Sequence, residues 1–318
     1  MAIQFGVYPG GAAGDDSGGL ATGPADLPRA IHHALDALES GTGTRLLVRG
    51  YTAFTDQGGP DATSILAPVD AEQYADGRFL DLVVQYRSRA ADIDGYTRFV
   101  RHVVRRFGAI TSTLQIAEEP NISGNGILDG DYPDILRAIV AGVAAANDEA
   151  RVCGVDHIRV GVNTTPLFGP SSGFYTELVA LGGRSLINGL AYIGLDMFPD
   201  VFRPVPGGDL RAATRGLLGY HRRDILGAAG LGHLPIHITE HGWPTSAERT
   251  PERQAAVLRD VVETILDAHE ELGVAAYELF SLRDADSNGS SLFHRFGIMT
   301  DDYAPKPAFD EFKRLIAR

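Results

Sequence analysis

Two glutamates stand in sequence contexts that suit paired carboxylate chemistry. Glu119 follows the apolar run Thr113–Ala117, and Glu240 ends the run Ile236–Glu240. Two carboxyl groups that face each other across a pocket can cleave a glycosidic bond, because one donates a proton to the leaving oxygen while the other attacks the anomeric carbon. Burial and mutual repulsion separate the pKa values of such a pair and thereby assign the two roles.

The elements that must position these glutamates follow from the hydrophobic pattern. Short runs rich in Val and Ile alternate with amphipathic stretches, which is typical of repeated βα units. Eight runs are predicted to be strands: Gln4–Tyr8, Arg45–Gly50, Asp81–Tyr86, Thr113–Ala117, Ile158–Asn163, Gly189–Asp196, Ile236–Glu240 and Val274–Phe280. Helices are predicted at Asp94–Phe107, Asp134–Ala146, Pro251–Leu272 and Pro307–Ile316.

Eight such units favour a closed barrel over an open doubly wound sheet. The Gly10-Gly11 pair after the first run does not form the G-x-G-x-x-G pattern that a dinucleotide site requires. No linker divides the chain, and α/β barrels of this length form one domain. We therefore predict an α/β protein with a single (β/α)8 TIM barrel as the catalytic domain over residues 1–318.

Four stretches rich in Gly, Pro or Ser follow predicted strands and not helices. They are Pro9–Pro24, Asp56–Pro60, Ser123–Gly130 and Asp284–Ser291. In a parallel barrel, the loops after the strands build the active-site face. Because Glu119 and Glu240 also lie at strand ends, they are expected on this same face.

The motifs around the two glutamates resemble those of the clan A glycoside hydrolases, which are retaining enzymes with a (β/α)8 barrel. The similarity rests on Glu119-Pro120-Asn121, on Thr239-Glu240-His241-Gly242-Trp243 and on the segment Phe296–Phe309. That last segment is similar to the F-G-aliphatic…P-K-P-A stretch before the final helix of those barrels, and Ser281–Asp284 fits the same pattern. Taken in order, the motifs cover most of the chain.

The resemblance implies roles for particular residues. Glu119 corresponds to the acid/base, Glu240 to the nucleophile and Arg49 to the arginine that supports the nucleophile. It implies an O-glycoside hydrolase with retention of configuration, acting by double displacement on a small β-linked glycoside or a related sugar derivative. No cofactor is implied.

One departure from the clan pattern lies beside the acid/base. The clan places Asn there, bonded to the sugar 2-hydroxyl, whereas this chain has Glu118. A carboxylate accepts a hydrogen bond from a hydroxyl but cannot donate one as an amide does. Glu118 is therefore expected to favour an amino group at C2, or a sugar whose C2 differs from that of glucose.

Two further departures concern aromatic residues. Phe198 stands where the clan often has a Tyr bonded to the nucleophile, so Glu240 is expected to lack that hydrogen bond. Phe280 stands where the clan usually has a Trp as sugar platform, and the chain has one Trp, Trp243. Clefts for polysaccharides stack sugars on several aromatic faces, so a small or aglycone-rich substrate is expected.

These departures leave a second hypothesis open, namely a glycosidase-like barrel with lost or altered chemistry. Such a barrel would be a binding protein, or a lyase or transglycosylase of small-molecule metabolism. The presence of both Glu119 and Glu240 argues against a site that has lost its function. Covalent modification of Glu240 would separate the two hypotheses.

Other residues are predicted to contact the substrate from the ends of the strands. Trp243 follows the nucleophile by three positions and is predicted to be a pocket wall, with a place in the core as the alternative. The remaining candidates are polar or aromatic residues that end predicted strands, namely Tyr8, Gln85, Asn163, Asp196 and Phe280.

The overall composition excludes several classes of partner. A net charge of −13 repels nucleic acid and anionic membrane surfaces. No H-x-H or H-E-x-x-H spacing predicts a metal site, and a single cysteine, Cys153, allows no intrachain disulfide. The start, Met1–Tyr8, lacks the pattern of a signal peptide, so a cytoplasmic location is expected. The oligomeric state is left open.

Overall fold

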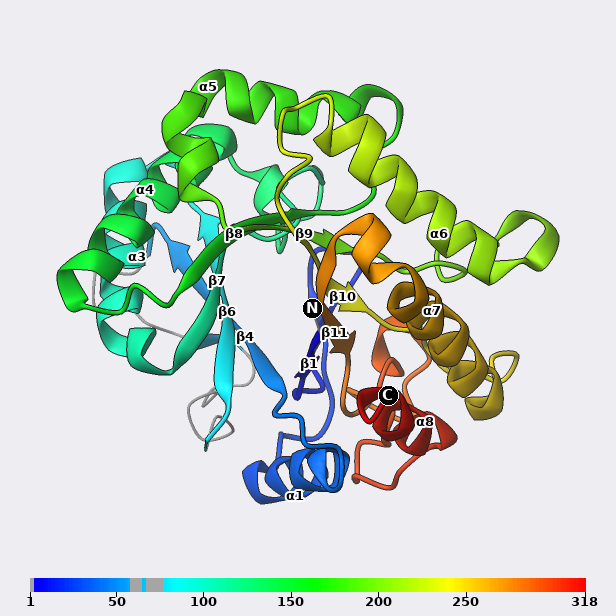
Figure 1. Ribbon diagram of the computed structural model, residues 1–318. Helices are drawn as coiled ribbons and strands as arrows, with labels where there is room; N and C mark the ends of the chain where they lie inside the picture. The colour runs from blue at the N-terminus through cyan, green and yellow to red at the C-terminus, as the bar shows by residue number, and fades with distance from the viewer. Residues whose placement is uncertain (1–2, 58–64, 67–76) are drawn as a thin grey trace.

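Eight parallel strands close into a barrel at the centre of the molecule (Figure 1). The computed structural model describes residues 3–57, 65–66 and 77–318. The barrel strands are β1 (Gln4–Tyr8), β4 (Leu47–Thr55), β6 (Phe79–Arg87), β7 (Thr111–Ile116), β8 (Arg159–Thr164), β9 (Tyr192–Asp196), β10 (Ile236–His241) and β11 (Val274–Phe280). Because β1 pairs in parallel with both β11 and β4, the first and last strands meet and the barrel is closed.

Helices surround the barrel as an outer ring (Figure 1). In the described residues these are α1 (Pro28–Glu39), α3 (Ile93–Phe107), α4 (Ile135–Cys153), α5 (Phe174–Gly189), α6 (Leu210–Tyr220), α7 (Pro251–Leu272) and α8 (Pro307–Ile316). The architecture is a (β/α)8 TIM barrel, which confirms the predicted fold class. None of these described helices is long and apolar enough to cross a membrane.

Several short elements are present in addition to the barrel strands and the surrounding helices. β5 (Ile65–Leu66) pairs antiparallel with β4, while β2 (Ala13–Gly14) and β3 (Leu20–Ala21) form a separate two-stranded ribbon. Single helical turns are η1 (Gly108–Ile110), η2 (Asp129–Asp131), η3 (Gly169–Gly173), η4 (Pro206–Gly208), η5 (His221–Leu226) and η6 (Leu292–His294).

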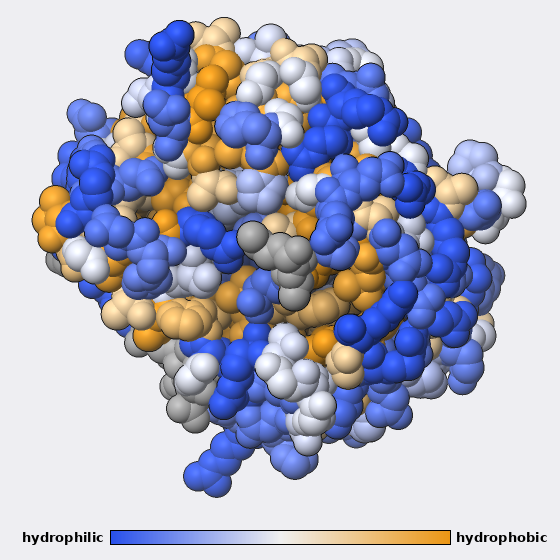
Figure 2. Space-filling model, viewed as in Figure 1, coloured by the Kyte–Doolittle hydropathy of each residue, from blue (hydrophilic) through white to orange (hydrophobic). Residues whose placement is uncertain are grey.

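Helix α7 begins where its sequence offers a cap. The Thr250 side chain accepts from the backbone N–H of Arg253 at the start of α7, and Pro251 occupies the first helical turn. The helix ends at Gly273, whose φ of 64° suits a residue without a Cβ. These local signals explain why α7 has the bounds that its sequence predicted. Hydrophilic side chains cover its outward face (Figure 2).

The predicted strands agree with the observed ones except at some ends. β1 and β11 match their predictions, whereas β4 continues to Thr55 instead of ending at Gly50. The extension brings Tyr51 into the strand, two positions after Arg49 and on the same side of it. Of the loops predicted to follow strands, Asp56–Pro60 lies partly outside the described residues, since residues 58–60 are not described.

Candidate active site

A cavity of about 990 Å³ lies at the C-terminal ends of the barrel strands. Strand ends contribute side chains from most of the barrel: Tyr8, Tyr51, Gln85, Glu118, Glu119, Asp196, Glu240 and Phe280. Parts of the predicted loops Pro9–Pro24 and Ser123–Gly130 also line it. The cavity therefore occupies the face on which barrel enzymes place their active sites.

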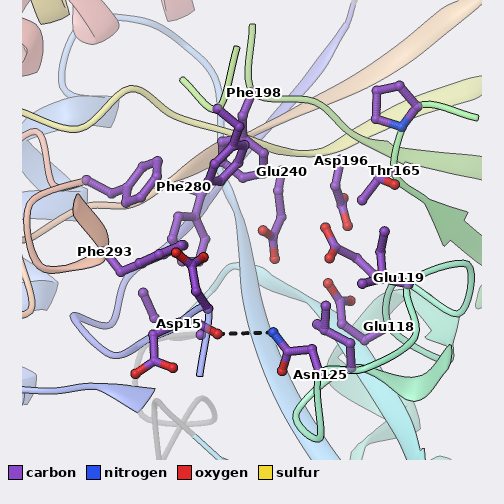
Figure 3. A pocket seen from close by; sticks show the side chains of 18 of the residues that line it. Asp15, Glu118, Glu119, Asn125, Thr165, Asp196, Phe198, Glu240, Phe280 and Phe293 are labelled. Atoms are coloured by element: carbon purple, nitrogen blue, oxygen red, sulfur yellow. Dashed lines mark hydrogen bonds between the residues drawn. The ribbon is translucent and has the colours of Figure 1, made fainter. Parts of the chain in front are cut away.

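Four carboxyl groups gather on one side of this cavity and form what we call the acidic floor. Glu118, Glu119, Asp196 and Glu240 point toward a common space (Figure 3). Oxygen atoms of Glu118, Glu119 and Asp196 lie within 4.8 Å of one another. The floor thus unites the two glutamates singled out by their motifs, although they come from β7 and β10.

The main chain around Glu119 is held in an unusual conformation. Ala117 and Glu119 have positive φ angles of 69° and 42°, which residues with a Cβ seldom adopt. The Asn163 side-chain oxygen accepts from the Glu119 backbone N–H at 3.0 Å. The buried carboxyl of Asp129 accepts from the backbone N–H of Glu118 at 3.0 Å and from a backbone N–H of β6. These bonds fix the direction of both glutamates.

Glu240 receives its support from β4. The Tyr51 hydroxyl donates a short hydrogen bond to Glu240 Oε1, and Arg49 Nε lies 3.7 Å from the same oxygen. Arg49 Nε in turn donates to the Tyr51 oxygen at 2.7 Å. Phe198 cannot supply the hydrogen bond that the clan's Tyr makes, but Glu240 still has a phenolic partner. Tyr51 supplies that bond from a different strand.

Arg49 organises the residues beneath the floor. Its Nη1 pairs with the Asp81 carboxylate, and its Nη2 lies 3.1 Å from Gln115 Oε1 and 3.3 Å from Glu118 Oε2. Glu118 Oε2 also accepts from Gln115 Nε2 at 2.6 Å and from Asn163 Nδ2 at 3.3 Å. Three donors therefore hold one oxygen of Glu118, which keeps this carboxyl group in a fixed orientation at the cavity.

Asp196 is held by two donors at the end of β9. Asn163 Nδ2 donates to Asp196 Oδ2, and Thr239 Oγ1 donates to Oδ1 at 2.6 Å. Gly194 makes this approach possible, because a Cβ there would lie 2.7 Å from the Asn163 Cβ and 2.8 Å from Thr239 Oγ1. Both Asp196 oxygens are thus engaged by protein groups. The absence of a metal at the three clustered carboxylates stays a prediction.

Burial and mutual repulsion raise the pKa values of the carboxyl groups in the acidic floor. Desolvation raises the pKa of Glu119 well above its ordinary value, and the charges of Glu118 and Glu240 add to the shift. The pKa of Glu240 rises to about 8, mainly through burial and then through Glu118, while Arg49 and the Tyr51 hydroxyl oppose the rise. Burial and the same neighbours raise the pKa of Asp196. Glu240 is therefore expected to ionise more readily than Glu119.

Tyr8, Gln85 and Phe280 line the cavity at the places where their strands end. Tyr8 stacks on Phe280 with ring centroids 5.1 Å apart, and its hydroxyl donates to the Ala12 carbonyl at 2.9 Å. Gln85 Nε2 donates to the Ile127 carbonyl at 3.1 Å, which ties β6 to the loop after β7. These three residues have the cavity-lining places that the sequence predicted.

Three of the predicted site residues do not line the cavity. Trp243 is only 5% exposed and is not a lining residue of the cavity; its ring lies 5.2 Å from the Arg249 guanidinium, so it belongs to the core. Arg49 and Asn163 are buried behind the lining residues. Their structural role is to position the floor, since each bonds floor residues directly.

No protein-family model matches the sequence, and the comparison with curated proteins gives no match. Solved structures do resemble the fold. One is a family 39 glycoside hydrolase from the gut symbiont Bacteroides cellulosilyticus WH2, with a TM-score of 0.61 and 14% identity over 91% of this chain and 60% of that one. The chain thus spans less than two thirds of that protein.

Two further structures match nearly their whole length. A β-glucosidase from Exiguobacterium marinum has a TM-score of 0.59 and 13% identity, over 99% of this chain and 97% of that one. A plant β-glucan endohydrolase has a TM-score of 0.61 and 11% identity, over 90% of this chain and 96% of that one. At such identities the similarity shows the barrel fold, which the clan A motifs had implied.

Sequence reasoning missed two features of this site. Tyr51 lay beyond the predicted end of its strand, although its spacing of two from Arg49 would have placed both on one face. The second feature is an aromatic wall opposite the floor, built from Phe198, Phe202, Phe280, Phe293 and Phe296. Only Phe198 and Phe280 were noticed, because the others lie in loops whose sequence has no periodic pattern.

Proposed function

We propose that this protein hydrolyses a small β-linked glycoside with retention of configuration. One observation carries the proposal: Glu119 and Glu240, from β7 and β10, face one cavity at the C-terminal end of a barrel (Figure 3). Their placement suits the double displacement that two opposed carboxyl groups perform on a glycosidic bond. The resemblance of the surrounding motifs to clan A, and the fold shared with glycoside hydrolases, support the same reading.

The raised pKa values support one assignment of the roles. Glu119, whose pKa is raised well above its ordinary value, keeps its proton and serves as general acid. Glu240 has support from Arg49 and the Tyr51 hydroxyl, both of which favour its ionised form, and so serves as nucleophile. Because the pKa of Glu240 is about 8, activity is expected to increase with pH up to the alkaline range.

The reaction then has two steps. Glu119 donates its proton to the glycosidic oxygen while a Glu240 oxygen attacks the anomeric carbon, so the aglycone leaves as an alcohol and a glycosyl ester forms. Glu119, now ionised, takes a proton from water, whose oxygen attacks the anomeric carbon and releases Glu240. Atoms and charges balance over the cycle, and no cofactor enters it.

Glu118 sets the preference at C2 of the sugar in this proposal. One of its oxygens is held by three donors, and the residue lines the cavity beside Glu119. A carboxylate at that place accepts from an ammonium group or from a hydroxyl. A 2-amino sugar is therefore included among the substrates to test. The cytoplasmic location expected from the sequence stays a prediction.

The test is the intact mass of the protein after incubation with cyclitol epoxides and activated β-glycosides. The panel includes 2-amino and 2-deoxy sugars, and Glu240→Gln is the matched variant because it keeps the side-chain shape. An added glycosyl or cyclitol unit on the wild type, absent from Glu240→Gln, is the expected result. The lack of any adduct and of any aglycone release would favour the barrel with altered chemistry or binding only.

A further inference from the structure

The aromatic wall shares the cavity with the acidic floor but has opposite chemistry. Phe198, Phe280 and Phe293 lie on the other side of the cavity from Glu118, Glu119 and Asp196, and Glu240 lies between the two groups (Figure 3). Phe198 contacts the rings of Phe202, Phe280 and Phe296 at centroid distances of 5.9, 6.2 and 5.7 Å. Phe293 contacts Phe202 at 6.1 Å and Phe296 at 6.3 Å. The five rings form one continuous apolar surface without a polar side-chain atom.

This wall leaves apolar surface open to solvent. Phe202 is 56% exposed, and two other lining residues of the same cavity, Phe168 and Leu20, are 55% and 48% exposed. Exposed large apolar side chains that converge on one cavity mark a binding groove, whereas scattered ones do not. The cavity therefore contains a large apolar compartment next to the carboxyl groups.

The loop that carries much of the wall is rigid by composition and by contacts. It follows β9, and three of its prolines, Pro199, Pro204 and Pro206, line the cavity. Arg249 Nη2 donates to the Val201 carbonyl at 2.9 Å, and the Val205 backbone N–H donates to Asp200 at 3.2 Å. A surface that is held in place before binding loses little entropy when a ligand arrives. These prolines and contacts restrain the part of the wall that follows β9 before any ligand arrives.

We propose that the aromatic wall binds an apolar aglycone, alkyl or aromatic, of the glycoside whose sugar lies on the acidic floor. The inference rests on the proposed function. A second sugar can stack on one ring face, but the five phenylalanine side chains offer no hydrogen-bond partner to its hydroxyl groups. An apolar group instead removes the exposed phenylalanine surface from water. The cavity of about 990 Å³ holds a sugar together with such a group.

The first experiment measures kcat/KM for methyl, butyl, hexyl and octyl β-D-glucosides and the matching 2-amino-2-deoxy series, below micelle formation. Alkyl leaving groups in this series have similar acidity, so the comparison isolates binding. We expect kcat/KM to rise roughly two- to fourfold per methylene, and to exceed the value for cellobiose. If kcat/KM does not change with alkyl chain length, or if it is higher for cellobiose, the proposal is overturned.

The second experiment locates the effect on the wall. Phe202→Ala is expected to raise KM for the octyl glycoside at least tenfold and to raise KM for the methyl glycoside by a much smaller factor. Phe79→Ala is the matched control, because Phe79 is also 50% exposed and does not line the cavity. Equal effects of the two variants would contradict the assignment.

A binding measurement separates this inference from the proposed function. Calorimetry with Glu240→Gln and the same alkyl glycosides is expected to give a heat capacity change that becomes more negative with chain length, since apolar burial has that signature. If the wild type forms covalent adducts but the alkyl series is flat, the wall is misassigned and the hydrolase proposal stands. If chain-length-dependent binding occurs without any adduct, the wall is correct and the hydrolase proposal fails.

Discussion

The two sides of the cavity differ in both origin and construction. The acidic floor comes mostly from strand ends. The carboxyl groups of Glu118, Asp196 and Glu240 are held by hydrogen bonds from side chains of neighbouring strands. Most of the aromatic wall comes from the loops after β9 and β11, and its members contact one another only through ring edges and faces.

The difference follows from the free energy of burying each kind of group. A buried carboxyl group requires fixed donors, because an unpaired charge away from water is strongly unfavourable. Strands provide such groups at defined spacing, which is why Asn163 on β8 can donate to Asp196 and also accept from the Glu119 backbone N–H. An apolar wall requires only contact, so loops can build it. In the proposed function, the strand ends therefore supply the reacting carboxyl groups and the preference at C2 of the sugar, whereas the loops supply the preference for the aglycone.

The largest expected effect comes from removing the Glu119 carboxyl group from the acidic floor. We expect Glu119→Ala to lower kcat for alkyl glycosides by about 10²–10⁴-fold, the usual contribution of a general acid. Aryl glycosides with acidic leaving groups should lose much less in the glycosylation step, because those groups depart without a proton. Steady-state and single-turnover kinetics with both classes measure the difference. The exposed Glu177 on α5 provides the control variant Glu177→Ala; equal losses in both substrate classes would contradict the acid role.

A smaller effect is expected at Tyr51. Its hydroxyl lowers the pKa of Glu240 from what burial alone would produce, so Tyr51→Phe raises that pKa further. Because Glu240 must be ionised to attack, the acidic limb of the kcat/KM profile should move to higher pH. At neutral pH the rate should fall by about tenfold, as expected for loss of a hydrogen bond to a charged group. Tyr132→Phe is the control, because it removes a hydroxyl that donates to the Gly126 carbonyl at 2.7 Å, and it should leave the pH profile unchanged.

The variant Glu118→Asn should shift the acidic limb of the kcat/KM pH profile in the direction opposite to Tyr51→Phe. The Glu118 charge raises the pKa values of Glu119 and Glu240, so Glu118→Asn lowers both, and the acidic limb moves to lower pH. The amide should also shift preference toward sugars with a free 2-hydroxyl and away from 2-amino sugars. Glu118→Gln keeps the chain length and separates the loss of charge from the change in shape. If neither the profile nor the sugar preference moves, Glu118 has only a structural role.

The smallest effect on activity is expected at Trp243, which belongs to neither side of the cavity. Trp243→Phe should leave kcat/KM within about twofold, since the ring lies in the core and not in the lining. Stability should decrease by about 1–2 kcal/mol because a smaller ring leaves a void. Thermal unfolding and kinetics on the same sample test both parts. A large change in KM without a change in Tm would show instead that Trp243 contacts the substrate.

The sequence by itself determined the barrel and the two glutamates. Alternating apolar runs and amphipathic stretches are local patterns, as are the Thr250 cap and Pro251 that start α7. The position of Glu119 and Glu240 at strand ends was equally local. Because parallel strands of a barrel all end on one face, placing two residues at strand ends was enough to bring them to the same cavity.

Only the tertiary structure decided which partners surround those glutamates. Tyr51 and Glu240 are separated by 189 positions, and no local pattern tells which phenol meets which carboxyl group. The same holds for the aromatic wall, whose members come from separate loops, and for Trp243, whose place in the core depends on how β10 and α7 pack. Secondary structure follows from short-range periodicity, whereas the pairing of side chains across a barrel depends on long-range packing of the whole chain.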